Sequence, residues 1–427
     1  MPPQSSRYRW FVVGVFFFFM LLHQTDKLMI GSLQVQISET FGLNNRQWGL
    51  INSGALIVAT VLYPIWGLLY DRYARVRLLS LASFIWGATT WMNAIVRTYG
   101  GFLVTRASTG IDDSSYPGIW TLIADYFGPN LRGKIYGILY LAQPLGYLVG
   151  TVLALIVAPM IGGWRSVFYI TGGLGIVIAA LIFFGVREMP RGKAEPEFEN
   201  MSEMQTFRFS WAEVREIFKK KTMWFVFLQG FAGQFPWAVI IYFIFKYLQT
   251  ERGYSNESAL FTMAPVILIL SGGYVIGGWA GDFLFKRTNK GRIIVSSMGV
   301  LVGAIFFYAA VTTPVEARTQ FFVFFCLAAI FAPMPGPNVI ATVYDVTVPE
   351  VRSTAQATEY FVENAGAAFA PFITGVLADA IDLQTAILLI CTVAWGLSFF
   401  FYLGALFTID HDTQALRAEM AARAKVM

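Results

Sequence analysis

The chain has 427 residues, of which 56% are hydrophobic and only 13% are charged, and its mean hydropathy is +0.58. A soluble globular protein carries about 25% charged residues, so this chain has too little polar surface for a water-soluble domain of its size. The net charge of +5 does not indicate nucleic-acid binding, because the basic residues gather at the ends of apolar segments. The composition indicates a protein that crosses a membrane several times.

Apolar segments long enough to cross a hydrocarbon core of about 30 Å follow one another along the chain. In the first half we place them at residues 9–38, 46–70, 77–96, 99–127, 132–160 and 166–186. In the second half we place them at residues 222–249, 256–283, 292–313, 318–347, 352–380 and 383–408. The sequence therefore predicts an all-α membrane protein with twelve transmembrane helices in two bundles of six.

The polar residues divide the chain into four parts. We expect a first six-helix bundle at 1–186, a cytoplasmic linker at 187–221, a second six-helix bundle at 222–409 and a cytoplasmic tail at 410–427. The linker ends in SWAEVREIFKKK, which is typical of a short amphipathic helix on a membrane surface. Most of the 31 lysines and arginines fall in the termini, the linker and the loops on one side, which places both termini in the cytoplasm by the positive-inside rule.

Two pairs of short segments recur at matching places in the two halves. GLLYDRYARVR at Gly67–Arg77 corresponds to GGWAGDFLFKR at Gly277–Arg287, and PNLRG at Pro129–Gly133 corresponds to PEVRS at Pro349–Ser353. Each pair places an acid or a base at the same end of a predicted helix. The two halves therefore read as an internal repeat, which is common in transporters.

GLLYDRYARVR resembles the loop signature G-x-L-x-D-R-x-G-R-R of the major facilitator superfamily. Gly67, Leu69, Asp71, Arg72 and Arg75 match, while Ala74 replaces the usual glycine. The resemblance implies a cytoplasmic gate, in which an acid at a helix end pairs with bases and holds one face of the transporter shut. The residues that we assign to this gate are Gly67, Asp71, Arg72, Arg75, Arg77, Asp282, Arg132 and Arg352.

Three further segments resemble the Spinster-like lipid transporters of that superfamily. They are TDKLMIGSLQVQISETFGLNNRQWGLINS, RASTGIDDSSYPG and VPEVRSTAQATEYFVENAGAAFAPFITGVLAD. Lys27 stands where that subgroup usually has arginine, Asp113 replaces a glutamate and Asp112 replaces a glycine. The resemblance implies a lysophospholipid or sphingoid phosphate as the substrate, and it implies that spans 1, 4, 7 and 10 line a central cavity. The three replacements fall in the expected binding region, so the substrate class carries over only as a hypothesis.

Ionisable residues inside the predicted spans are candidates for function, because a charge at the bilayer centre costs about 2.5–3.5 kcal/mol on insertion scales. We expect Asp26 and Lys27, which point about 100° apart on one helix, to find partners on other helices, with Arg106 as the first partner of Asp26. Arg106 and Asp113 share a helix face, whereas Asp112 points about 100° away from Asp113. One of the two aspartates could therefore serve a structural partner.

The candidate site residues fall into two sets. The substrate-binding candidates are Lys27, Arg106, Tyr116, Trp120, Gln229, Gln234 and Asn338; an arginine fork suits phosphate or carboxylate. The proton-coupling candidates are His23, Asp26, Asp112, Asp113, Glu359 and Glu363. A structural ion pair remains the alternative for each charged residue, and a histidine on an apolar helix is more often a packed residue than a proton relay. Glu359 and Glu363 lie on one helix face and repel, so one carries a proton or pairs with Lys27 or Lys246.

The function that these features predict is secondary active transport by alternating access, coupled to protons, with an amphipathic anion such as a lysophospholipid as the substrate. The alternative is a small hydrophilic organic anion or sugar using the same cavity. A channel or a receptor would not need repeated gates. The sequence has no P-loop, no metal-ligand cluster and no nucleophile–base motif, so we expect no enzyme activity, no cofactor and no metal. We expect a monomer whose partners are its substrate, protons and membrane lipids.

Overall fold

The protein is described by a computed structural model that covers residues 6–113, 115–127, 135, 138–139, 141–189, 215, 217–347 and 352–424. Every regular element in these residues is a helix. The chain forms two compact units, Met1–Phe207 with Tyr242–Lys246, and Arg208–Ile241 with Tyr247–Met427. Most of the predicted amphipathic helix before Lys221 lies outside the described residues, although Arg215 and residues 217–219 are helical.

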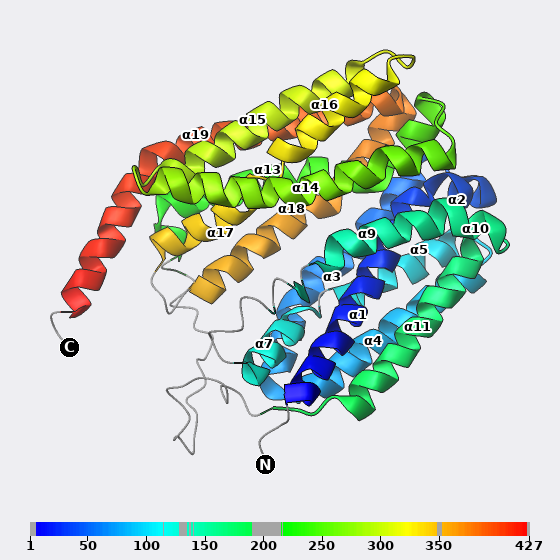
Figure 1. Ribbon diagram of the computed structural model, residues 1–427, viewed down its shortest axis with the longest axis horizontal. Coiled ribbons are helices and arrows are strands. Elements are labelled where there is room, and N and C mark those ends of the chain that lie inside the picture. Colours follow the sequence, from blue (N-terminus) through cyan, green and yellow to red (C-terminus); the bar gives the residue numbers. More distant parts are fainter. Residues whose placement is uncertain are drawn as a thin grey trace. The chain divides into compact units, whose positions relative to one another are not determined.

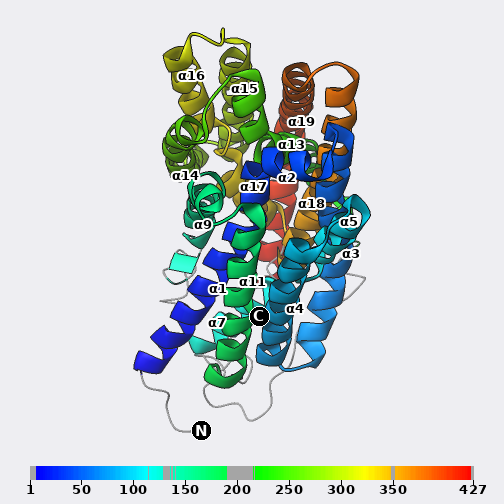
Figure 2. The same ribbon diagram turned by 90° about the vertical axis from the view of Figure 1, so that its right-hand side faces the viewer.

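The helices of the first unit are drawn from blue to green in Figure 1. They are α1 (Ser6–Ser32), α2 (Gln34–Phe41), α3 (Asn45–Arg72), α4 (Arg75–Ile95), α5 (Tyr99–Ser108), α6 (Gly110–Asp113), α7 (Pro117–Tyr126), α9 (Ala142–Val152), η1 (Leu153–Val157), α10 (Ala158–Met160) and α11 (Trp164–Gly185). Within this unit α4 packs along α11, and α1 packs against both α9 and α11. Figure 2 shows α1, α11 and α4 running side by side.

Local chemistry explains where the long helix α3 begins. The Asn44 side chain accepts a hydrogen bond from the backbone N–H of Gln47 at 2.8 Å, and the Gln47 side chain accepts one from the Asn44 N–H at 3.1 Å. This reciprocal capping satisfies two donors that a helix N-terminus otherwise leaves free. The helix then runs through the whole predicted second span, so its start and its apolar length are both set by local sequence.

The fourth expected span, 99–127, is not one helix but three short ones. α5 ends at Ser108, α6 covers one turn, and α7 restarts at Pro117. Proline favours the first turn of a helix and disfavours its interior, which explains the restart. α6 packs closely on α3, because a Cβ at Gly110 would meet the backbone and Val58 side chain of α3. The break leaves Asp112 and Asp113 at a helix end rather than in the middle of a continuous helix.

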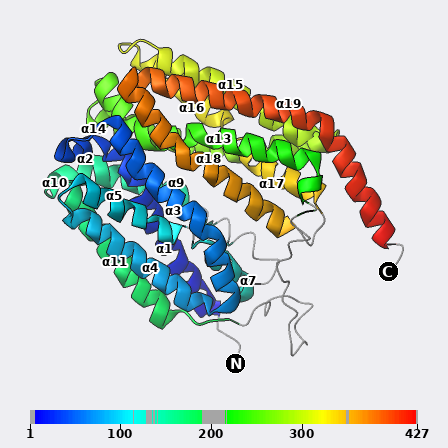
Figure 3. The same ribbon diagram turned by 180° about the vertical axis from the view of Figure 1, so that it is seen from behind.

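The helices of the second unit are drawn from green to red in Figure 3. They are α13 (Lys221–Lys246, whose last residues belong to the first unit), η3 (Tyr247–Glu251), α14 (Asn256–Phe285), α15 (Gly291–Thr312), α16 (Arg318–Phe331), α17 (Pro335–Val346), α18 (Arg352–Ala380) and α19 (Leu383–Ala424). α15 packs on α14, α16, α17 and α19, and α18 packs on α19. The tenth expected span, 318–347, is again broken near its middle and restarts at a proline, Pro335, as the fourth span does at Pro117.

The last helix, α19, continues well beyond the predicted end of the span at residue 408. It begins after Asp382, whose carboxylate accepts a hydrogen bond from the Thr385 backbone N–H at 2.7 Å. That backbone donor holds the pKa of the Asp382 carboxyl below its usual value. The segment after residue 408 contains no proline or glycine and has five alanines and two arginines, which are strong helix formers, so the helix continues to Ala424.

Eleven stretches of the described chain are long and apolar enough to cross a membrane. They correspond to all the expected segments except 99–127, which is covered by the three short helices α5, α6 and α7. The expected fold class is confirmed: this is an all-α membrane protein of twelve spans in two related six-helix halves.

Candidate functional site

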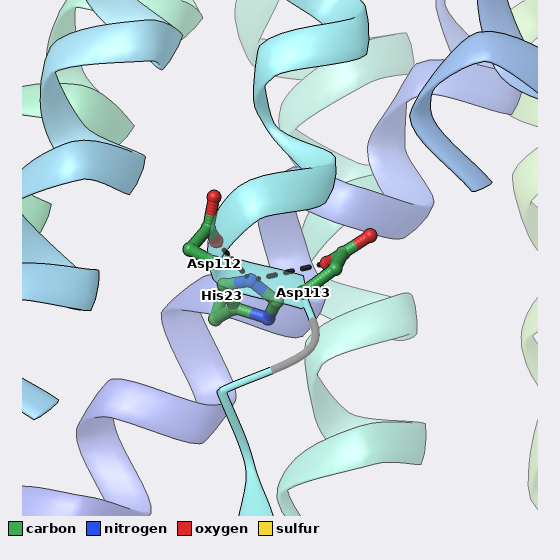
Figure 4. A group of neighbouring side chains, drawn as sticks. All are labelled: His23, Asp112 and Asp113. Carbon is green, nitrogen blue, oxygen red and sulfur yellow. Dashed lines mark hydrogen bonds and ion pairs between the residues drawn. The ribbon is translucent and has the colours of Figure 1, made fainter. Parts of the chain in front are cut away.

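A buried histidine and two buried aspartates meet inside the first unit. His23 comes from α1, and Asp112 and Asp113 come from the single turn of α6. The His23 Nε2 atom lies 2.6 Å from Asp112 Oδ2 and 3.2 Å from Asp113 Oδ1. Figure 4 shows the imidazole lying between the two carboxyl groups. Because carboxylate oxygens accept hydrogen bonds, the geometry places a hydrogen on Nε2.

The other ring nitrogen of His23 is also engaged. The Tyr116 hydroxyl lies 2.7 Å from His23 Nδ1, and the Gln24 amide donates to the same hydroxyl at 3.2 Å. The chain Gln24–Tyr116–His23–Asp112 therefore joins α1 to the start of α7 through side chains alone. Such a series of polar groups in a dry interior orients each member through its neighbour.

Lys27 adds a cation to this cluster. Its Nζ lies 3.2 Å from Asp113 Oδ2, and its side chain is 27% exposed while that of Asp113 is 8% exposed. Lys27 is therefore the more accessible partner in this pair. The pair explains why α1 carries a lysine among apolar residues. The buried carboxylate of Asp113 requires a partner charge or hydrogen bonds, and Lys27 supplies the charge.

Asp112 and Asp113 share one partner, His23, and Asp113 also pairs with Lys27. Both carboxyl groups reach His23, because α6 ends at Asp113 and its side chains converge on a ring that enters from α1. His23, Asp112 and Asp113 also have the spacing of a possible metal-ligand group, with their ligand atoms within 4.8 Å of one another. All three residues were candidates from the sequence, but the contact of His23 with the two aspartates was not predicted, because 89 positions separate His23 from Asp112.

Asp26 is held mainly by neutral donors, not by the expected arginine. Its Oδ2 atom accepts hydrogen bonds from Trp86 Nε1 at 3.2 Å and Thr90 Oγ1 at 3.0 Å, and its Oδ1 atom accepts one from Thr171 Oγ1 at 3.0 Å. Arg106 Nη1 lies 4.0 Å from Asp26 Oδ2, and Arg106 Nε has no hydrogen-bond partner among the described residues. The Asp26–Arg106 pair exists, but it is the longest contact of this carboxylate.

We expect Asp26→Asn to lower the free energy of unfolding by about 2–3 kcal/mol, because an amide nitrogen would face donors on α4 or α11 and leave them buried without an acceptor. Thermal unfolding of the purified protein in detergent measures this. Glu39→Gln, which changes an exposed acid on α2 to an amide, is the matched control and should have no effect. An unaltered unfolding temperature in Asp26→Asn would show that the three hydrogen bonds do not hold α1 to α4 and α11.

The remaining candidates of the fourth span lie beside this cluster. Tyr116 bonds His23 directly, whereas Trp120 is half-buried and packs against the apolar core of the first unit. The sequence assigned both residues to substrate contact. The Tyr116 hydroxyl joins the polar network, and its ring also packs edge-on against the His23 ring, with centroids 5.2 Å apart.

The second unit contains a cavity of about 90 Å³, lined mainly by residues of α13, α17 and α19. Gln229, Gln234 and Glu363, three of the predicted residues, line it. Glu359 is buried one turn away from Glu363 and accepts a hydrogen bond from Gln356 of the same helix at 2.9 Å. A Cβ placed on Gly230 would lie 3.3 Å from Glu359 Oε1 and 3.6 Å from Glu363 Oε1, so both carboxyl groups face the same point of α13.

Two expectations about the second unit differ from the contacts in the structure: the partners of the glutamates and the position of Asn338. Lys27 and Lys246, proposed as partners of the glutamates, belong to the first unit, where Lys27 pairs with Asp113 and Lys246 Nζ lies 2.9 Å from Asn45 Oδ1. Asn338 is not among the residues that line the cavity. Its amide donates to the backbone carbonyls of Gly277 and Met334 at 2.8 and 2.9 Å, which ties α17 to α14.

The charge clusters at the predicted gate centre on arginines. Arg75, buried at the start of α4, bonds the carboxylate of Asp125 at the end of α7, Glu188 at 2.9 Å and the Met189 carbonyl at 2.7 Å. In the second unit Arg292 bonds Asp345 at the end of α17 and Asp282 at 2.8 Å. The two clusters have the same construction. In each half of the chain, an arginine at the start of that half's third span bonds an aspartate at the end of its fourth span.

Sequence reasoning missed four members of these clusters, Asp125, Glu188, Arg292 and Asp345. A signal for two of them was present: Asp125 and Asp345 stand at the same distance before the repeated segments PNLRG and PEVRS. Of the predicted gate residues, Arg75 and Asp282 lie in the clusters, and Arg77 is exposed. Arg132 and the side chains of Asp71, Arg72 and Arg352 lie outside what the structure describes, and so does the surrounding of Gly67.

The model of the Major Facilitator Superfamily matches residues 15–371. The chain belongs to this superfamily. Among the proteins that this chain resembles is Protein spinster of Drosophila melanogaster, which is 28% identical over 385 residues, 88% of this chain and 63% of that protein. The sphingosine-1-phosphate transporter SPNS2 of Danio rerio is 25% identical over 441 residues, 96% of this chain and 87% of that one. The chain thus spans less than two thirds of the Drosophila protein.

Solved structures share the major facilitator fold. A bacterial homolog of the human lysosomal transporter Spinster, in an inward-facing and unoccupied conformation, superposes with a TM-score of 0.85 at 22% identity and covers 96% of this chain and 99% of its own. The nucleoside transporter NupG superposes with a TM-score of 0.72 at 14% identity, covering 94% of this chain and 99% of its own. A major facilitator transporter moves solutes across a membrane. The resemblance to the Spinster-like group that the sequence indicated is confirmed.

Proposed function

We propose that this protein is a secondary active transporter that moves an amphipathic anion, such as a lysophospholipid or a sphingoid phosphate, by alternating access and in exchange with or together with protons. The observation that carries the proposal is the buried cluster of Lys27, His23, Asp112 and Asp113 with Arg106 nearby. Membrane interiors accept such charges where they serve transport or pair with one another. The SPNS2 relatives, named as sphingosine-1-phosphate transporters, support the substrate class.

The cluster provides a means to couple an anion to a proton. Lys27, the more exposed member of its pair, and Arg106, whose Nε is unpaired among the described residues, are the cations that an anionic head group can engage. When the anion draws Lys27 away, Asp113 loses its counter-charge, and a carboxyl in a dry site without a counter-charge favours its neutral form. Substrate binding and protonation are then linked, because each changes the free energy of the other.

Other candidates take secondary parts in this scheme. His23 passes the proton between Asp112 and Asp113, since it contacts both. Glu359 and Glu363 provide a second protonatable pair in the other unit. The Arg75 and Arg292 clusters act as the cytoplasmic gate, with both termini in the cytoplasm, and each opens by separating its arginine from its aspartates. We propose that the protein works as a monomer.

Uptake into proteoliposomes tests the proposal. With an imposed pH gradient, we expect fluorescent lysophosphatidic acid to move across the bilayer at least about tenfold faster than in empty liposomes or in liposomes without the gradient. Saturable transport of a water-soluble sugar or small organic anion, with no movement of the lysolipid, would favour the hydrophilic alternative. Equal lysolipid transport with and without the gradient would contradict proton coupling while leaving the substrate class intact.

A further inference from the structure

The cavity of the second unit is acidic, and the described residues that line it include no counter-charge. Glu363 lines it and Glu359 lies beside Glu363, whereas none of the residues that line it is a lysine or an arginine. The glutamates' neighbours from α13 are the amide of Gln234 and the small residue Gly230. Two carboxyl groups so close together repel when both are charged, so an added positive charge at this place would be stabilised by both.

Polar atoms around the same cavity lack protein partners. The Ser398 hydroxyl from α19, 1% exposed, and the Gln229 amide nitrogen from α13, 4% exposed, have no hydrogen-bond partner among the described residues, and both residues line the cavity. A buried polar atom left without a partner costs about 1–3 kcal/mol, so two such atoms on the wall of one cavity indicate a site built for a polar ligand.

Glycines keep the space open. A Cβ on Gly230 would lie within 3.0 Å of the Glu363 side chain, and a Cβ on Gly233 would lie 3.4 Å from Ser398 Oγ and 3.8 Å from Gln229 Oε1. These two glycines, three positions apart, are on one face of α13. Because glycine is unfavourable within a helix, its use at both positions is consistent with a need for room beside the unpartnered atoms.

Aromatic rings form part of the wall, beside aliphatic side chains and prolines. Trp237 and Trp395 face each other edge-on with ring centroids 6.4 Å apart, and Tyr274 lines the cavity with them. Rings of this kind attract a cation placed over their faces, most strongly for tryptophan. Small metal ions prefer a shell of oxygen atoms, whereas a carboxyl pair surrounded by aromatic rings suits an organic ammonium group, whose alkyl substituents contact the rings.

We propose that this cavity binds an organic ammonium group, with Glu363 and Glu359 supplying the negative charge, Trp237 and Trp395 the aromatic faces, and Ser398 and Gln229 hydrogen bonds to polar atoms next to the nitrogen. The ammonium group belongs either to a small free cation or to the head group of an amphipathic molecule. The binding of a free cation does not depend on the proposed transport of anionic amphipaths. The head-group case rests on that proposal and narrows it to amphipathic substrates that carry an ammonium group beside the anionic group, as a sphingoid phosphate does.

Isothermal titration of the full-length protein with choline chloride, at constant ionic strength set with sodium chloride, tests the binding. We expect saturable binding that becomes at least about tenfold weaker in Glu363→Gln, because loss of a buried charge partner removes a large part of the binding free energy. Trp237→Leu should weaken binding in the same direction, and Trp237→Phe should weaken it less. Glu257→Gln, which neutralises an exposed acid in the first turn of α14, is the control and should bind as the original chain does.

Transport of two lysolipids then identifies the source of the ammonium group. If it belongs to a head group, Glu363→Gln slows lysophosphatidylcholine more than lysophosphatidic acid, which has no ammonium, so the ratio of the two transport rates falls. If it belongs to a free cation, choline binds while both lysolipids respond alike to the substitution. Equal choline binding by the original protein and Glu363→Gln, or no binding above sodium chloride, overturns the inference. Choline binding that depends on Glu363, without transport of either lysolipid, would reject the proposed transport of amphipathic anions and would still support the ammonium site in this cavity.

Discussion

Arg75→Leu is expected to lower the free energy of unfolding by about 3–5 kcal/mol, because it leaves a buried carboxylate without its counter-charge. The Arg75 side chain is 4% exposed and that of its partner Asp125 is 8% exposed. The guanidinium also bonds Glu188 and the Met189 carbonyl, so a single residue holds the start of α4, the end of α7 and the segment after α11. Chemical unfolding in detergent micelles, followed by tryptophan fluorescence, measures the loss.

The matched substitution in the second unit is expected to have a much smaller effect. Arg292 occupies the same place in the repeat, but its side chain is 15% exposed and its partners Asp282 and Asp345 are 65% and 21% exposed. Exposed ion pairs contribute about 0–1 kcal/mol, so Arg292→Leu should cost about 1 kcal/mol. The double variant Arg75→Leu/Asp125→Leu should regain part of the loss, because it leaves neither charge buried alone. Equal losses in the two single variants would show that burial does not set the strength of these clusters.

The fold was largely predictable from the sequence because apolar length sets the spans. The third span was expected at 77–96 and α4 covers Arg75–Ile95; the eleventh was expected at 352–380 and α18 covers Arg352–Ala380. The helix breaks inside the fourth and tenth spans were not predicted, because hydropathy does not change where a helix stops and restarts within an apolar segment. Pro117 and Pro335 were the available signals, and each marks the point where a new helix begins.

The candidate site was predictable in its members but not in its contacts. Ionised residues stand out in an apolar chain, so His23, Asp26, Lys27, Asp112 and Asp113 were all identified. The main partners of Asp26, however, are Trp86, Thr90 and Thr171, which are ordinary residues of apolar spans and carry no signal in the sequence.

The helix-face argument for Asp112 and Asp113 did not predict their shared partner, for a related reason. Angles around a helix apply only where the helix continues, and α6 ends at Asp113. Which buried charges meet is decided by the packing of helices that are far apart in the sequence. The unpartnered atoms around the cavity of α13 are likewise a property of packing, and no residue pattern indicated them.

Lys27→Met should weaken anion binding, whereas Asp113→Asn should not. Loss of the Lys27 charge removes a cation that the proposed substrate engages. Because truncating one partner of a buried charge pair costs at least about 2 kcal/mol, we expect the affinity for lysophosphatidic acid to fall at least about thirtyfold. Asp113→Asn frees the same Nζ from the carboxylate 3.2 Å away, so binding should be kept or become tighter. Transport by Asp113→Asn should nevertheless lose its dependence on the pH gradient. Binding is measured by titration, and transport in proteoliposomes.

This pair of variants separates a working site from a fixed structural ion pair. If Lys27 and Asp113 only hold α1 to α6, both variants lose stability, the double variant Lys27→Met/Asp113→Asn recovers it, and anion binding does not distinguish between the two single changes. If they act as proposed, the double variant recovers stability without recovering binding, because the cation is still missing. Lys27→Arg, which keeps the charge on a longer and planar group, should retain most of the affinity. The decisive quantity is therefore the sign of the change in Asp113→Asn, since no purely structural role for Asp113 predicts that its loss leaves anion binding intact or improves it.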